Sequence, residues 1–171
     1  GSEYVGPQHK GGDIVRGIRH EDAMQLSFPD GSLDAVMSND VFEHVPSPDR
    51  AFREAARVLK PGGKMFFTVP FFLDRETNTQ RADVVDGVVK HYKEPEFHGN
   101  PFSKDGSLVF TEFGWQLVSQ MRERGFLSDK EIDDLEWRMR SARVALHEAQ
   151  YGLSQTRLTA PVARLYLYSG M

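Results

Sequence analysis

A helix flanked by two apolar runs, between residues 21 and 70, constrains the fold of this chain more than any other feature. The runs 33–38 and 64–69 carry the branched and aromatic residues that are typical of buried strands. Between them, Ser47 provides a helix N-cap and Pro48 occupies the first helical position. The order strand, helix, strand predicts a βαβ unit with two parallel strands and a crossover helix. We therefore expect an α/β layer fold.

Length and composition favour a single domain that spans 1–171 and is able to bury a core of its own. We divide it into a first half, 1–73, a middle region, 74–110, and a C-terminal part, 111–171. A net charge of -4 argues against a nucleic-acid partner, because phosphate binding requires a basic surface. No apolar run is long enough for a membrane span and the chain contains no cysteine, so we expect a cytoplasmic protein without a membrane partner.

The remaining patterns predict further elements around the βαβ unit. The polar and poorly periodic stretch 74–93 is expected to form a mobile excursion or lid. A helix is predicted over 111–125 and a second one over 128–152, the latter opened by a capping box. The alternation of 162–168 predicts a final strand.

Polar residues follow the first strand of the unit, and this position has a chemical meaning. In open α/β sheets ligands bind outside the carboxyl ends of the strands. Asn39, Asp40 and His44 stand at that point of the chain. Among these residues, the imidazole of His44 can act as a general base near neutral pH.

These patterns resemble the middle of a class I S-adenosylmethionine-dependent methyltransferase of the type 11 group. The resemblance rests on an acid-plus-alanine turn at 22–23, the run 26–34, and an Asn-Asp segment ending in Glu-His at 39–46. It continues through the His-rich run 91–101 and the aromatic run 106–115. The resemblance implies a Rossmann-like sheet with helices on both faces.

The resemblance also implies a cofactor, S-adenosylmethionine, with S-adenosylhomocysteine as the product. By this analogy Glu3 binds the ribose hydroxyls and Asp22 accepts a hydrogen bond from the adenine amino group. The amide of Ala23 meets a ring nitrogen, and Asn39 faces the cofactor. A carboxylate suits the adenine amino group because that group only donates hydrogen bonds.

The same analogy assigns the substrate side of the site. Asp40 and His44 are the candidate catalytic residues, and His44 either orients the loop or acts as a base. His91 and His98 are the candidate substrate-binding residues, in a wall over the active site. A small molecule is the expected substrate, whose identity and methyl-accepting atom the sequence leaves open.

We expect no metal, although one alternative stays open. The spacing D-x-x-E-H over Asp40, Glu43 and His44 is similar to that of methyltransferases that bind Mg²⁺, for which oxygen ligands are suited. In this alternative His91 or His98 completes the metal site from the second half of the chain.

The glycine-rich cofactor loop of the family is not found ahead of Glu3, and the glycines at 6–12 come after it. The sequence therefore resembles an N-terminally truncated member of the family, and three interpretations follow. The chain is a piece of a longer methyltransferase, or a shortened relative that binds without methylating. The third is a homo-oligomer in which a second chain completes the open edge of the sheet.

Overall fold

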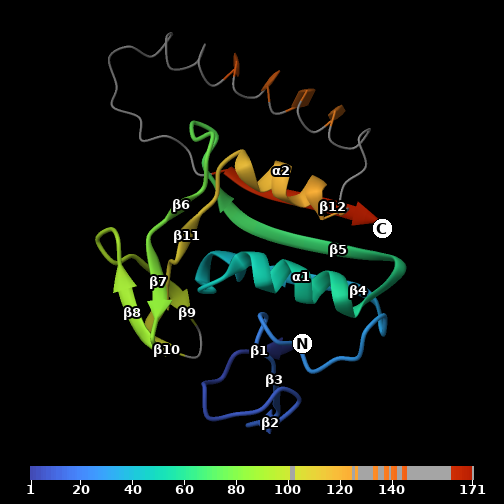
Figure 1. Ribbon diagram of the computed structural model, residues 1–171, viewed down its shortest axis with the longest axis vertical. Coiled ribbons are helices and arrows are strands. Elements are labelled where there is room, and N and C mark those ends of the chain that lie inside the picture. The colour runs from blue at the N-terminus through green and yellow to red at the C-terminus, as the bar shows by residue number, and fades with distance from the viewer. Residues whose placement is uncertain are drawn as a thin grey trace.

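The computed structural model describes residues 1–100, 103–124, 126, 133–134, 137–138, 140–141, 144–145 and 163–170. The described chain combines many strands with a few helices, and two of the strands are parallel and joined by a helix, so the predicted α/β fold class is confirmed (Figure 1). The described strands form two three-stranded sheets and three two-stranded ones. None of the described helices is both long and apolar enough to cross a bilayer.

The predicted βαβ unit is present. Strand β4 (Leu33–Asn39) leads through the short 3₁₀ helix η1 (Phe42–His44) to α1 (Pro48–Val58) and then to β5 (Leu59–Phe71). β4 and β5 are parallel, with Val36 opposite Met65. The side chain of Ser47 accepts the amide of Arg50, as predicted for an N-cap. β5 is longer than predicted, because the chain passes from α1 straight into the ladder.

The central sheet has the order β12-β5-β4, which leaves β4 at one edge among the described strands. The final strand, predicted at 162–168, is observed as β12 (Ala163–Gly170), and it runs antiparallel to β5 along the length of the ladder. β5 is therefore paired on both sides and forms the centre of the sheet.

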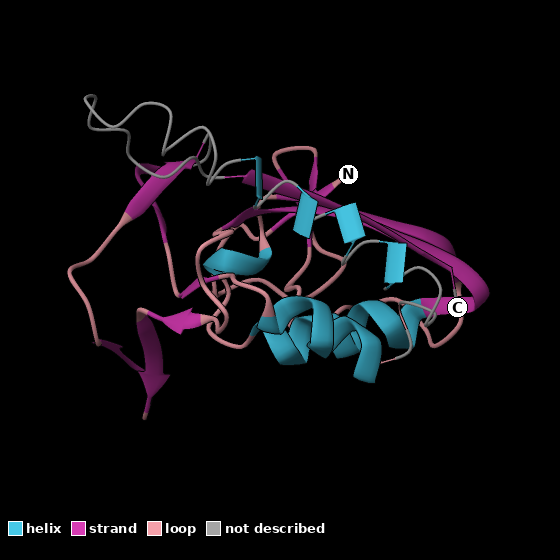
Figure 2. Ribbon diagram, turned by 90° about the horizontal axis from the view of Figure 1, so that it is seen from above, coloured by secondary structure: helices cyan, strands magenta, loops and turns pink. Residues whose placement is uncertain are grey.

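The hydrophobic core lies between β5 and two helices, α1 and α2 (Gln116–Glu123). Alternate residues of β5 point to the same face of the strand, and those of one face are buried. Figure 2 shows the two helices on one side of the long strands. The buried residues from these three elements include Phe52, Ala55, Met65, Phe67, Val69, Phe71, Leu117 and Met121. Core packing thus fixes the carboxyl ends of β4 and β5.

The helix predicted from residue 111 begins later. Residues 111–112 form β11 (Thr111–Glu112), which pairs antiparallel with β6 (Thr79–Gln80), and α2 starts only after Trp115. Backbone pairing with a distant segment overrides the local helical pattern here, because both strand residues are buried. The end expected at Gly125 lies outside the described residues. So does most of the helix predicted over 128–152, of which the described residues are helical.

The stretch 74–93, which we expected to form a mobile excursion or lid, contains a β-hairpin, and a second hairpin follows it. β7 (Ala82–Val85) pairs with β8 (Val88–His91), and β9 (Phe97–Asn100) pairs with β10 (Ser103–Leu108). The β7–β8 turn has positive φ at Asp86 (52°) and at Gly87 (77°), as a two-residue hairpin loop requires. The two hairpins lie beside each other at the end of the molecule where β5 finishes (Figure 1).

The N-terminal residues form a separate small sheet of β1 (Ser2–Glu3), β2 (Ile14–Val15) and β3 (Ile18–His20), in the order β1-β3-β2. β1 and β3 are parallel.

Arg57 of α1 ties the segment that follows this small sheet to the main body. Its Nη2 lies 2.9 Å from the carbonyl of Leu26 and its Nη1 lies 3.0 Å from that of Phe28. The same guanidinium also pairs with Glu54 and Asp30. The loop between the two sheets is thus anchored by one planar group with several donors.

Candidate active site

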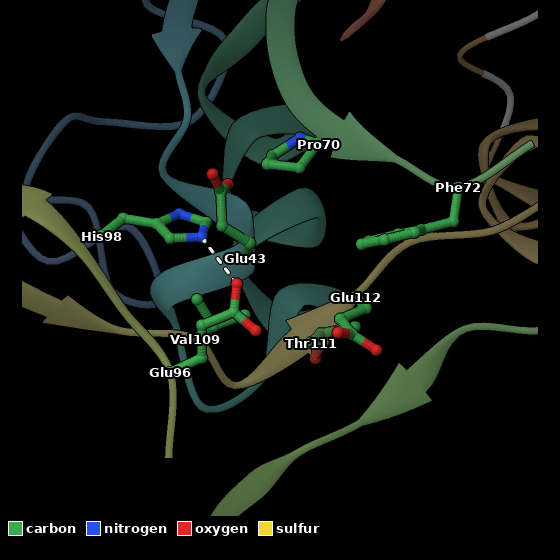
Figure 3. A pocket seen from close by; sticks show the side chains of 8 residues that line it. All are labelled: Glu43, Pro70, Phe72, Glu96, His98, Val109, Thr111 and Glu112. Carbon is green, nitrogen blue, oxygen red and sulfur yellow. Dashed lines mark hydrogen bonds and ion pairs between the residues drawn. The ribbon is translucent and has the colours of Figure 1, made fainter. Parts of the chain in front are cut away.

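A pocket opens at the carboxyl ends of β4 and β5, where ligands bind in sheets of this kind. Its lining comes from η1, from the end of β5, from the middle region and from β11. The residues are Glu43, Pro70, Phe72, Glu96, His98, Val109, Thr111 and Glu112 (Figure 3). The structure thus brings Glu43 of the segment 39–46 together with Glu96 and His98 of the His-rich run.

Three of the predicted or alternative site residues converge at this pocket. Glu43, His44 and His98 each offer a ligand atom, and these atoms all lie within 4.8 Å of one another. The rings of His44 and His98 are nearly perpendicular, with their centroids 5.0 Å apart. His44 Nε2 lies 3.7 Å from Glu43 Oε1. Residues from two distant segments are thus brought into one cluster.

A backbone carbonyl determines which ring nitrogen of His44 carries the proton. The ring Nδ1 lies 2.9 Å from the carbonyl oxygen of Leu108, and since a carbonyl only accepts, Nδ1 must carry the proton. In the neutral ring Nε2 then has a free lone pair. Burial lowers the pKa of His44 below its ordinary value, and the nearby His98 lowers it further, against opposing effects of Leu108 and Asp40. His44 is therefore neutral at pH 7.

Asp40 occupies an uncommon backbone conformation directly after β4. Its φ is +49°, in the left-handed region that side chains rarely adopt. Its Oδ1 accepts the hydroxyl of Thr68 at 2.9 Å, and its amide donates to the carbonyl of the same residue at 3.0 Å. Such backbone outliers cluster at functional sites, where the surrounding structure holds them in place. Asn39, one position earlier, ends β4 and is exposed.

Glu112 is an acidic residue in the lining of the pocket, and the sequence analysis did not predict a role for it. It is buried and pairs with Nη1 of Arg75 and with Nη1 of Arg81. Burial raises the pKa of its carboxyl, but the hydrogen bonds and charges of the two arginines outweigh burial and bring the pKa below its ordinary value. No motif signals this group of Glu112, Arg75 and Arg81, because its members stand in a polar stretch and in a segment that we predicted to be helical.

The predicted adenosine-binding residues lie together at the small N-terminal sheet. Glu3 ends β1 and pairs in register with His20, which ends the parallel strand β3, and Asp22 follows two residues later. The amide of Glu21 donates to the carbonyl of Glu3 at 3.0 Å. Two carboxylates thus stand at the carboxyl ends of neighbouring parallel strands.

Asp22 is held in place by its own turn. Its Oδ1 accepts the amide of Met24 at 2.8 Å, so one carboxylate oxygen fixes the loop that contains Ala23. The Tyr4 ring lies beside His20, with the ring centroids 5.2 Å apart, and partial burial and the charge of Asp22 raise the pKa of its phenol. An aromatic ring and an acid therefore flank the end of β3.

The neighbouring Glu21 was not singled out from the sequence, although it is more deeply buried than Asp22. Its carboxylate accepts from Arg19 Nε at 2.8 Å and from the amide of Ser27 at 2.8 Å. Burial raises the pKa of Glu21, but these hydrogen bonds outweigh burial and lower it. The residue closes the loop that presents Asp22.

His91 lies apart from the other predicted residues. It is exposed at the end of β8, where it pairs in register with Ala82. It does not line the pocket, and it is outside the cluster of Glu43, His44 and His98. A substrate role for His91 stays a prediction that this arrangement does not favour.

Comparison with known families gives one match over the first part of the chain. Residues 5–67 match the family model described as a methyltransferase domain. The matched range includes Asp22, Asn39, Asp40 and His44, and it ends within β5. It therefore covers β2 and β3 of the small N-terminal sheet and most of the βαβ unit, while β1 with Glu3 lies just ahead of it.

Individual relatives are similar over part of the chain. The chain is 30% identical over 118 residues to 27-O-demethylrifamycin SV methyltransferase of Amycolatopsis mediterranei, covering 62% of this chain and 43% of the relative. It is 47% identical over 65 residues to sarcosine/dimethylglycine N-methyltransferase of Halorhodospira halochloris, covering 38% of this chain and 20% of the relative. The chain thus spans less than half the length of these curated relatives.

Among solved structures, the S-adenosylmethionine dependent methyltransferase from Mesorhizobium loti is similar over 98% of this chain and 73% of its own. The sequence identity is 17% and the TM-score is 0.47.

Proposed function

We propose that this chain binds S-adenosylmethionine and methylates a small molecule, on the basis of the match of residues 5–67 to the methyltransferase domain family and of the similar relatives. The cofactor supplies an electrophilic methyl group, so the protein has to position the cofactor and the acceptor for in-line displacement. The observation that carries the proposal is the pair of carboxylates, Glu3 and Asp22, at neighbouring strand ends within or beside the matched range.

The chemistry of this pair fits adenosine. Ribose hydroxyls and the adenine amino group donate hydrogen bonds, and carboxylates accept them. Glu3 is exposed at the end of β1 and can accept from both ribose hydroxyls. Asp22 uses one oxygen for the amide of Met24 and has a second oxygen for the adenine amino group. The backbone of Ala23 follows in the same turn and supplies the amide for a ring nitrogen.

Residues at the end of β4 stand where the acceptor would meet the cofactor. Asn39 and Asp40 lie at the carboxyl end of the strand, and His44 follows in η1. We propose that Asn39 faces the cofactor. We also propose that Asp40 holds the turn after β4 in its conformation through its hydrogen bond with Thr68. The neutral His44, with a lone pair on Nε2, can take a proton from an acceptor hydroxyl or ammonium group.

The pocket beside the turn after β4 is the proposed substrate site. Phe72 and Pro70 supply apolar surface, while Glu96 and His98 supply hydrogen-bonding groups at its wall. Apolar surface with a few convergent polar groups is typical of small-molecule sites. The relatives compared above are named for small-molecule substrates, which supports the same class here.

Titration of S-adenosylhomocysteine into the protein by isothermal calorimetry tests the proposal. We expect one-to-one binding with micromolar affinity, and ATP serves as a control for binding of adenosine alone. No detectable heat, together with no thermal shift, would overturn the assignment of cofactor binding to this chain.

The alternative function is a module that has lost cofactor binding and self-assembles. β4 is the edge of the central sheet among the described strands, and Met37 on it is 80% exposed. Exposed strand edges pair readily with other chains. This alternative predicts the absence of binding in the same titration together with a homo-oligomer in solution.

A further inference from the structure

We propose that Glu43, His44 and His98 form a binding site for a divalent transition metal, with Zn²⁺ as its representative ion, at the wall of the pocket. The three ligand atoms lie within 4.8 Å of one another and come from η1 and β9. Zinc–nitrogen and zinc–oxygen bonds of about 2.0–2.2 Å in a tetrahedral site hold ligand atoms roughly 3.4 Å apart. Small side-chain rotations would bring the three atoms to this spacing.

The hydrogen bonds of both histidines prepare them as ligands. His44 donates from Nδ1 to the carbonyl of Leu108, so Nε2 keeps the lone pair that a metal requires. This Nε2 is also the atom that faces the carboxylate of Glu43, at 3.7 Å. Metal-binding histidines commonly donate their second ring nitrogen to a carbonyl or carboxylate in this way.

His98 shows the same arrangement with a different partner. Its Nε2 lies 3.3 Å from Oε1 of Glu96, which only accepts, so the second nitrogen is the available ligand atom. Figure 3 shows Glu96 and the carboxylate of Glu43 on opposite sides of the His98 ring. Each histidine thus has an orienting partner on one side and the proposed ion on the other.

The burial of the three residues favours a cation that enters from the pocket. The side chain of Glu43 is 1% exposed, that of His44 is 15% exposed and that of His98 is 34% exposed. A buried carboxylate is costly unless its charge is compensated, and a cation held beside it provides compensation. The half-exposed His98 leaves a path from solvent, and it leaves room for a water or substrate group as a further ligand.

The donor set selects the kind of metal. Two imidazoles and one carboxylate suit Zn²⁺ and other first-row divalent ions, while Mg²⁺ prefers oxygen ligands only. The alternative considered from the sequence was an Mg²⁺ site that included Asp40. Within the described residues the cluster contains His98 in place of Asp40 and His91. Three protein ligands with an open position are the pattern of a catalytic rather than a structural site.

Metal binding can be measured without any methyl transfer, and its outcome is distinct from that of the titration with S-adenosylhomocysteine, which tests Glu3 and Asp22. With the ion bound, Nε2 of His44 is a metal ligand and does not serve as the base described above; that role belongs to the metal-free protein. The protein is stripped with EDTA, dialysed, and titrated with Zn²⁺ by isothermal calorimetry, with Mg²⁺ in a parallel titration. We expect one Zn²⁺ per chain and much weaker binding of Mg²⁺. The expected loss of Zn²⁺ affinity in His98→Gln is at least tenfold, since a direct ligand is removed.

His91→Gln is the matched control, because His91 is an exposed histidine of the same region outside the cluster. We expect it to bind Zn²⁺ like the unmodified protein. Glu43→Gln is a second test, with circular dichroism to verify folding, because a buried charge is removed. No Zn²⁺ binding by the stripped protein, or equal affinity in His98→Gln, would overturn the proposal. So would a loss of affinity in His91→Gln alone, or tighter binding of Mg²⁺ than of Zn²⁺.

Discussion

Arg81 donates from Nη1 to Oε1 of Glu112 at the base of the pocket, in an ion pair that joins the middle region to β11. Arg75 holds the other carboxylate oxygen of Glu112. Because Glu112 is buried, its removal leaves two arginines facing a neutral site. We expect Glu112→Gln to lower the free energy of unfolding by about 2–3 kcal/mol, less than for a fully buried pair, since Arg75 is partly exposed. Urea denaturation measures the loss.

The pH dependence of stability gives a second readout of the same group. The pKa of Glu112 is lowered in the folded state, so its contribution is fully present above the ordinary carboxyl pKa of 4.5. It is lost as the pH falls below 4.5 through the lower folded value. We expect the difference in unfolding free energy between the unmodified protein and Glu112→Gln to shrink over that range. A difference that stays constant from pH 7 to pH 3 would contradict the lowered pKa.

Two substitutions of Asp40 test how its positive φ and its hydrogen bond with Thr68 contribute to stability. Asn tolerates positive φ and can accept the hydroxyl of Thr68, so we expect Asp40→Asn to change stability by less than about 0.5 kcal/mol. A β-branched residue at the same φ is strained and cannot accept, so Asp40→Val should lose about 2 kcal/mol or more. Thermal or urea unfolding measures both. Equal stability of the two variants would show that neither the positive φ of Asp40 nor its hydrogen bond with Thr68 constrains the turn after β4.

Cofactor binding gives a direct test of Asp22. Asparagine has one side-chain oxygen, and the amide of Met24 already occupies that position, so Asp22→Asn keeps the turn but loses the acceptor for adenine. Charge-assisted hydrogen bonds contribute about 1.5–3 kcal/mol, so we expect S-adenosylhomocysteine to bind at least tenfold more weakly. Calorimetry measures the affinity. Asp34→Asn is the control, since this carboxylate is exposed and pairs only with Lys60 among the contacts described. Unchanged affinity in Asp22→Asn would remove that residue from the site.

Arg57 illustrates a contact that depends on the shape of the side chain. Its guanidinium reaches two carboxylates and the carbonyls of Leu26 and Phe28 at once, which a lysine ammonium cannot do. We expect Arg57→Lys to cost about 1–3 kcal/mol of unfolding free energy. Arg53→Lys is the matched control on the same helix, because Arg53 is exposed and makes one ion pair with Asp49. That variant should lose less than about 0.5 kcal/mol. Equal losses of unfolding free energy in the two variants, measured by urea denaturation, would contradict a role for the planar guanidinium of Arg57.

Local signals predicted the βαβ unit well. The N-cap at Ser47, the position of Pro48 in the first turn and the two strand runs are properties of contiguous residues, and each one is confirmed. The helix predicted from residue 111 was wrong at its start, because the pairing of β11 with β6 is decided by a segment some thirty residues away. Boundaries that depend on such pairing cannot be read from a local pattern.

The site was predicted in part for the same reason. The run 39–46 and the run 91–101 were recognised separately, and the meeting of His44 with His98 needed the fold. Glu112 was missed because its role depends on Arg75 and Arg81, which no motif links to it. Ligand spacing along a helix or loop is visible in a sequence, while a cluster assembled by hairpins is not.

The exposed apolar residue on the edge strand of the central sheet tests self-association. Met37 is 80% exposed on β4, which pairs with β5 on one side only among the described strands. If a second chain pairs with this edge, sedimentation velocity should show a concentration-dependent dimer. A lysine at this position places a charge beside the proposed contact, so Met37→Lys should weaken the dimer at least tenfold. Ile14→Lys is the control, because Ile14 is an exposed apolar residue of an edge strand in the small N-terminal sheet. A monomer at the highest concentration, or equal weakening by both substitutions, would exclude pairing through β4.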